Sequence, residues 1–141
     1  TNISRINLTD STSKKNFAKQ LLNQDSTRSP LKVTLAFPTL RNFVDNEKTR
    51  IIYNNLLKEL QNDLSNKFPK REWKDLFDQL QEYGNDLEFF SSSGNGILLF
   101  ADLDIIYKID IPHNLSAYVY AGDQFLIKDI FGFDKTYRKP I

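Results

Sequence analysis

The middle of the chain has the apolar pattern of two helices. Over residues 47–67, apolar side chains recur every four residues, and a second periodic segment follows over residues 70–83. Recurrence at three and four residues places side chains on one helical face. Pro69 separates the two segments, and Gly84 follows the second at the position where a helix commonly ends. Because only residues 68 and 69 separate the two segments, the pattern predicts an antiparallel helical hairpin. The apolar positions are Ile52, Leu56, Leu60 and Leu64, joined by Tyr53 and Leu57, in the first segment, and Trp73, Leu76, Phe77, Leu80 and Tyr83 in the second.

Shorter stretches on both sides of this hairpin have the pattern of β-strands. Residues 31–39 combine β-branched and aromatic side chains and end at a proline, and their odd-numbered apolar positions share one face. Residues 97–101 contain no polar side chain, which predicts a central strand covered on both faces. Residues 102–104 then form a turn. The predicted strands are residues 31–39, 87–90, 97–101, 105–111 and 117–121.

The two ends of the chain are less regular. Residues 1–12 are polar with scattered Ile and Leu, which predicts an N-terminal arm. Ser13 is a suitable N-cap for a short helix that ends near Gln24. We therefore expect an α+β fold, in which a mainly antiparallel sheet of about five strands carries the helical hairpin and the short N-terminal helix. Residues 13–141 are expected to form a single domain.

Composition narrows the functional classes. The chain has 141 residues, 19 basic and 18 acidic, and a net charge of +1. This balance argues against binding nucleic acid by bulk charge and predicts no DNA partner. No cysteine is present, which removes disulfides and thiolate chemistry. No apolar run approaches the ~20 residues that span a membrane. Without a methionine, the natural start is missing, and the chain is expected to be a fragment or a trimmed chain.

Residues 91–96, "SSSGNG", pose a question of function because small residues and glycines also make phosphate-binding loops. A P-loop needs Lys-Ser or Lys-Thr after its glycines, followed by a helix. Here the segment lacks that lysine and leads into a predicted strand. The favoured interpretation is that Gly94 and Gly96 allow a sharp turn between neighbouring strands.

Other candidates for chemistry also have simpler interpretations. His113, the only histidine, follows a proline and is interpreted as solvated surface. Asp102 and Asp104 are interpreted as turn residues, and the polar face of a helix accounts for Asp75 and Asp78. No catalytic residue, metal or cofactor is predicted. A small hydrolase that uses the serines near residue 91 or His113 is a third, less favoured hypothesis.

A polar stripe on the long helix is the candidate RNA-binding surface. Arg50, Asn54 and Lys58 recur every four residues, with Arg41 and Lys48 upstream. Arginine, lysine and asparagine side chains commonly contact phosphate oxygens. The alternative is an ordinary solvated helix face, because acidic residues dilute the positive charge. These acidic residues are Glu47, Glu59 and Asp63.

Aromatic side chains offer another route to RNA, because bases stack on exposed rings. Tyr118 and Tyr120 lie two residues apart on one predicted strand and are the best candidates for such a platform. Most other aromatic residues fall at positions expected in the core.

Four segments, in order, resemble a known family. They are "VTLAFPT" (33–39), "EKTRIIYNNLLKELQNDL" (47–64), "SSSGNGILLFADLDIIYKIDIP" (91–112) and "VYAGDQFLIKDIF" (119–131). Together they are similar to the N-terminal domain of a bacterial family of archaeo-eukaryotic-type peptide chain release factor homologues. The resemblance covers about residues 31–131.

The resemblance implies a cytoplasmic protein of several domains that acts on or near the ribosome, and it implies that this chain is an N-terminal fragment of that longer protein. In eukaryotic and archaeal relatives the first domain reads the codon, and a middle domain carries a Gly-Gly-Gln loop. This chain contains no Gly-Gly-Gln and no matching codon-reading motif. The leading hypothesis is a non-catalytic domain that contacts the ribosome, tRNA or other RNA during termination or ribosome rescue. The alternative is a structural or protein–protein interaction domain without an RNA role; the oligomeric state is not predicted.

Overall fold

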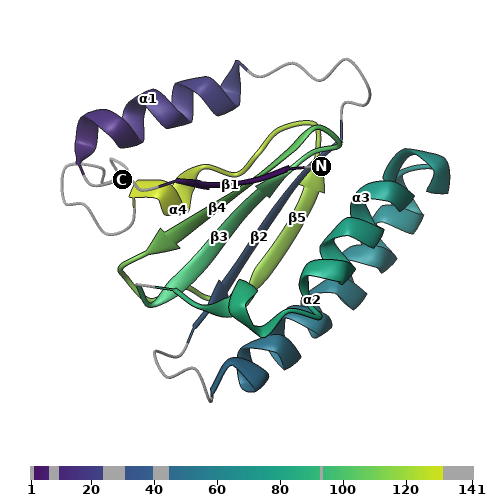
Figure 1. Ribbon diagram of the computed structural model, residues 1–141. Helices are drawn as coiled ribbons and strands as arrows, with labels where there is room; N and C mark the ends of the chain where they lie inside the picture. The colour runs from purple at the N-terminus through teal and green to yellow at the C-terminus, as the bar shows by residue number, and fades with distance from the viewer. Residues whose placement is uncertain (1, 7–9, 24–30, 40–44, 93, 132–141) are drawn as a thin grey trace, which may run out of the picture.

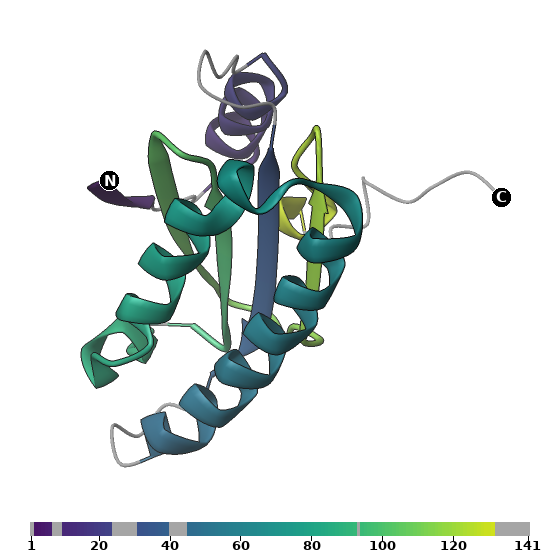
Figure 2. The same cartoon turned by 90° about the vertical axis from the view of Figure 1, so that its right-hand side faces the viewer.

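A five-stranded mixed sheet lies between two helical layers (Figures 1 and 2). The computed structural model describes residues 2–6, 10–23, 31–39, 45–92 and 94–131. The strands are β1 (Asn2–Ile6), β2 (Lys32–Pro38), β3 (Gly96–Ala101), β4 (Ile105–Ile111) and β5 (Tyr118–Gly122). The helices are α1 (Ser11–Leu22), α2 (Asn46–Lys67), α3 (Lys70–Tyr83), the 3₁₀ helix η2 (Leu87–Phe90) and α4 (Lys128–Phe131).

The strand order in the sheet is β1-β4-β3-β2-β5. Three of the four strand pairs are antiparallel, and β1 pairs with β4 in parallel. This arrangement confirms the predicted α+β fold with a mainly antiparallel sheet. Every residue of β3 is buried. Alternate side chains of β3 enter different cores, because Ile97 and Leu99 face one helical layer while Leu98 and Phe100 face the other. The prediction of a central strand covered on both faces is confirmed.

The helices α2 and α3 cover one face of the sheet, as Figure 2 shows from their side. The hairpin forms where the periodicity predicts it, with α2 ending at Lys67 and α3 beginning at Lys70. Between them Phe68 is extended, and its backbone N–H donates to the Leu64 carbonyl at the end of α2. The odd-numbered residues of β2 all enter this core. The buried side chains of the hairpin are Tyr53, Leu56, Leu57, Leu60, Leu64, Trp73, Leu76, Phe77 and Leu80.

Gly84, which directly follows α3, is required there for space rather than for a special backbone conformation. Its φ of −67° is right-handed, so it does not adopt the left-handed conformation common after helices. Instead, a Cβ atom at this position would lie 3.2 Å from Cε2 of Tyr53. The Tyr53 hydroxyl also donates to the Leu80 carbonyl at 2.7 Å. Glycine at residue 84 therefore leaves room for the ring that caps the end of α3.

The opposite face of the sheet is covered by α1 and α4 (Figure 1). Asp10, rather than Ser13, is the N-cap of α1: its side chain accepts from the Ser13 backbone N–H at 2.7 Å. Ser13 completes a capping box at the N3 position. From α1, Phe17 packs edge-on against Tyr107 with 5.2 Å between ring centroids. The short N-terminal helix thus closes the second core.

The predicted arm over residues 1–12 is wrong for its first half, because Asn2–Ile6 form the edge strand β1. Ile3 packs against the α2–α3 core, whereas Ile6 packs against the α1 core. Each isoleucine is separated from the next by polar residues, so the local pattern does not indicate a strand. Its pairing with β4 supplies the backbone partners that such a short polar segment lacks by itself.

Residues 87–90 are also not the predicted strand but the 3₁₀ helix η2. The Asp86 side chain accepts from the Glu88 backbone N–H at 3.0 Å and starts the turn. In a strand, Phe89 and Phe90 would point to opposite faces, whereas here both enter the α2–α3 core. The sheet still has five strands, as predicted, because residues 2–6 form the strand β1 although residues 87–90 do not form one.

Candidate functional site

The predicted RNA-binding residues do not form one uniform stripe. Arg41 lies outside the described residues. Lys48 and Arg50, near the start of α2, each have an acidic neighbour. The Nζ atom of Lys48 lies 3.8 Å from Oδ1 of Asp45. The guanidinium of Arg50 donates to Oε1 of Glu47 at 2.6 Å. These two carboxylates locally offset the positive charge of the first turns of the helix.

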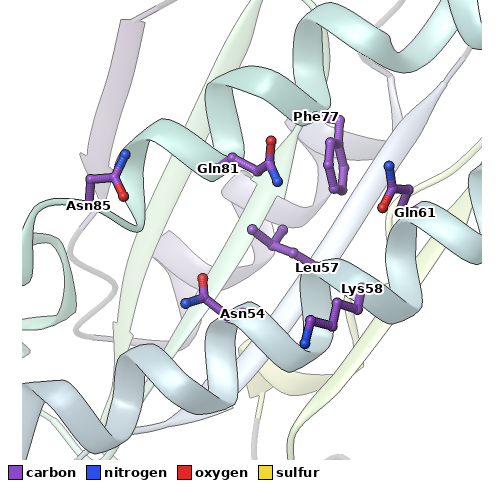
Figure 3. A pocket seen from close by; sticks show the side chains of 7 residues that line it. All are labelled: Asn54, Leu57, Lys58, Gln61, Phe77, Gln81 and Asn85. Carbon is purple, nitrogen blue, oxygen red and sulfur yellow. The ribbon is translucent and has the colours of Figure 1, made fainter.

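Asn54 and Lys58 lie further along α2, beside a hollow between α2 and α3 with a volume of about 510 Å³ (Figure 3). We call it the α2–α3 hollow. Side chains from both helices face it, and the buried residues Leu57 and Phe77 belong to its wall. Its lining residues are Asn54, Leu57, Lys58, Gln61, Phe77, Gln81 and Asn85.

The chemistry of the α2–α3 hollow is amide-rich and weakly cationic. Four carboxamides and one ammonium group line it, and no carboxylate is among the lining residues. In the part of the chain that the structure describes, Lys58 forms no ion pair. Carboxamides both donate and accept hydrogen bonds, and a lysine supplies a mobile positive charge. Such a set can contact phosphate, ribose hydroxyl or peptide groups.

The sequence predicts two of these seven lining residues as RNA-binding, namely Asn54 and Lys58, because of their spacing along one helix. Gln81 and Asn85 were missed because the antiparallel packing of α3 brings them opposite α2. A signal was available, because Phe77, Gln81 and Asn85 also recur every four residues. Combining it with the predicted hairpin indicates a shared polar groove.

The tyrosines of β5 are not free stacking platforms. Tyr120 is 37% exposed, but the Nζ atom of Lys67 lies 5.5 Å from the centroid of its ring. Tyr118 is half-buried, and the Nζ atom of Lys128 lies 5.1 Å from its ring centroid. A base stacking on the same ring faces would have to displace these lysines.

The "SSSGNG" segment is held by backbone contacts rather than arranged around an anion. The backbone N–H of Asn95 donates to the Ile111 carbonyl at 2.8 Å, and the Asn95 carbonyl accepts from Thr39 at 3.0 Å. A Cβ at Gly94 would lie 2.3 Å from the Ile111 carbonyl oxygen, so only glycine fits. The segment joins η2 to β3, which corrects the predicted turn between two strands. Ser93 lies outside the described residues.

The acidic candidates occupy the places expected of turn and surface residues. Oδ1 of Asp102 accepts from the backbone N–H groups of Asp104 and Ile105 at 2.7 and 2.9 Å. Asp75 and Asp78 are exposed on α3, and Asp78 lies 2.6 Å from the Nζ atom of Lys74. Within the described ranges, no group of three or more His, Cys, Asp or Glu side chains is arranged to hold a metal ion.

A comparison with protein-family models and with curated proteins finds no match to this chain. Among the described residues, no helix combines the length and the apolar character needed to cross a membrane. Any function of the α2–α3 hollow therefore has to be inferred from the residues that line it and from the resemblance of the four sequence segments.

Proposed function

We propose that the chain is a non-catalytic N-terminal domain of a release-factor-like cytoplasmic protein. In this proposal it contacts the ribosome or tRNA through the α2–α3 hollow during termination or ribosome rescue. The observation that carries the proposal is the lining of the hollow. It combines two of the predicted RNA-binding residues, Asn54 and Lys58, with three further carboxamides and no carboxylate.

The proposed contact depends on hydrogen bonds more than on bulk charge. The net charge is only +1, so the chain has little long-range attraction for polyanions. A carboxamide groove with one lysine suits a short piece of RNA backbone, where phosphate and ribose both need partners. Neutralising one or two phosphates gives a shallow salt dependence, with a log–log slope of about −0.7 per phosphate for single strands.

Charge removal at Lys58 tests this proposal. We expect Lys58→Gln to weaken binding to purified bacterial ribosomes or deacylated tRNA by about tenfold, the equivalent of one charge-assisted contact. Fluorescence anisotropy of the labelled chain at low salt measures the affinity. The matched control is Lys15→Gln, because Lys15 is exposed on α1, which covers the opposite face of the sheet. The affinity of Lys15→Gln for ribosomes and tRNA should equal that of the wild type.

A second variant tests the hollow without removing a cation. Gln81→Glu introduces a carboxylate of nearly the same shape into the lining and should repel phosphate. Equal losses for Lys15→Gln and Lys58→Gln, or no binding of ribosomes and tRNA at low salt, would contradict the proposal. The second result favours the alternative of a structural or protein–protein interaction domain, whose partner a pull-down would then identify.

A further inference from the structure

A second hollow, of about 140 Å³, lies where β1 and β4 meet the segment that joins α3 to η2. It involves none of the residues of the α2–α3 hollow. Two cations, two carboxylates and two aromatic rings line it. They are Arg5, Lys108, Asp86, Glu88, Tyr83 and Phe89. We call it the charged hollow.

The two cations lie side by side on neighbouring strands. Arg5 of β1 is in register with Lys108 of β4, and residues in register across a sheet project from the same face. Lys108 is only 3% exposed. Its Nζ atom donates to the Ser91 carbonyl at 3.1 Å and lies 5.4 Å from the centroid of the Phe89 ring. Two neighbouring positive charges, one of them buried, favour an anion beside them.

The two carboxylates come from the loop and the 3₁₀ helix on the other side of the hollow. Oδ1 of Asp86 accepts from the Glu88 backbone N–H at 3.0 Å, which fixes the position of Asp86. Within the described ranges, no ion pair joins Arg5 or Lys108 to either carboxylate. All four charged groups line the hollow, and the two carboxylates act on Lys108 electrostatically without a direct ion pair.

The buried amine of Lys108 has a lowered pKa. Burial lowers the pKa of its amine, and neighbouring Arg5 lowers that pKa further. Asp110, Glu88 and Asp86 oppose this shift, but the net direction is still downward. A ligand carboxylate in the hollow would stabilise the charged amine and raise its pKa again.

The remaining wall is apolar and is formed by Ile3 and Tyr83, which are both half-buried. Phe89 supports this wall from behind: it is buried, and its ring stacks on that of Tyr83 with 5.2 Å between centroids and an interplanar angle of 5°. Such a surface accepts a small aliphatic group by burying it from water.

We propose that the charged hollow binds a small α-amino acid in its zwitterionic form. The ligand carboxylate is held between Arg5 and Lys108, and the ligand ammonium is held by Asp86 and Glu88. The α-substituent lies against Ile3 and Tyr83. The lining carries two positive and two negative groups, so a neutral ligand with separated charges matches it better than a simple anion or cation. A hollow of about 140 Å³ suits a small amino acid such as glycine, alanine or serine.

Calorimetric titration with capped ligands tests the two charge contacts separately. At pH 7 and low salt, we expect glycine and alanine to bind. N-acetylglycine, which lacks the ammonium, and glycinamide, which lacks the carboxylate, should each bind at least about tenfold more weakly. Chemical shift changes at the backbone amides of Glu88 and Phe89 in ¹⁵N NMR spectra place the ligand in this hollow.

Variants at exposed residues complete the test without removing a buried side chain. Arg5→Gln and Glu88→Gln should each weaken glycine binding by about tenfold. The control Arg71→Gln, at an exposed position of α3 outside the hollow, should leave the affinity for glycine unchanged. N-acetylglycine binding as tightly as glycine would overturn the proposal in favour of an anion site. Amino acid affinities weaker than about 10 mM, or shift changes confined to other residues, would overturn it as well.

Discussion

Tyr53 shows how one side chain joins several parts of the α2–α3 core. Its ring contacts the rings of Phe37, Phe89 and Phe90, with centroid separations of 5.3 to 5.6 Å. Its hydroxyl satisfies the Leu80 carbonyl, one of the last four of α3, which lack partners within the helix. The apolar period of α2 predicted that this position is buried. The partner of the hydroxyl depends on the hairpin geometry, which the period does not specify.

Tyr53→Phe should destabilise the fold by about 1–2 kcal/mol, because it leaves the buried Leu80 carbonyl without its donor. Urea denaturation measures the difference, and Tyr120→Phe at the exposed edge should change stability by less than about 0.5 kcal/mol. Burial raises the pKa of the Tyr53 hydroxyl above its ordinary value of 10.0. This contribution to stability is present below pH 10 and is lost as the pH rises further, since the unfolded chain ionises first. The advantage of the wild type over Tyr53→Phe should therefore shrink in alkaline solution.

Among the elements, the β3–β4 hairpin depends on a buried carboxylate that also contacts β2. Asp102 caps the turn with Oδ1, while its Oδ2 lies 3.8 Å from the Nζ atom of Lys32. The side chains of this pair are 1% and 7% exposed. The sequence predicted the turn function of Asp102, because aspartate commonly accepts from turn N–H groups. It did not predict the partner, because β2 lies far from the hairpin in the sequence.

The variant Asp102→Asn keeps an acceptor for the turn but leaves the Lys32 ammonium buried without its counter-charge. We expect it to lower the free energy of unfolding by about 3 kcal/mol. Adding Lys32→Met should recover part of this loss, since both charges are then removed together. Urea denaturation of the two single variants and the double variant gives the coupling. Strictly additive changes would show that the two side chains do not interact.

The molecule as a whole rests on two cores that share the central strand. Leu98 enters the core on the side of α1 and α4, Leu99 enters the core under the hairpin, and both are fully buried. Leu98 belongs to the core that α1 and α4 cover, and α1 joins this core through Phe17 and Leu21. A molecule with only the hairpin layer would leave this second face in water.

Leu98→Ala and Leu99→Ala should therefore each cost about 2–5 kcal/mol, the range for removing a buried leucine. Thermal or urea denaturation measures both, with Leu22→Ala as the control, because Leu22 is 52% exposed. A cost below about 1 kcal/mol for Leu98→Ala alone would show that the layer of α1 and α4 does not cover that face in solution.

The sequence by itself determined the α2–α3 hairpin, the central strand β3, the turn at Asp102 and the α+β class. Each of these has a strong local cause, because apolar period, proline position and turn chemistry act over a few residues. The tertiary structure decided that residues 2–6 form β1, that residues 87–90 form a 3₁₀ helix, and that Gln81 and Asn85 face Asn54 and Lys58. These features depend on partners distant along the chain. An edge strand and a packed aromatic pair are stable only when another element is present, and a groove between two helices exists only once the helices have packed together.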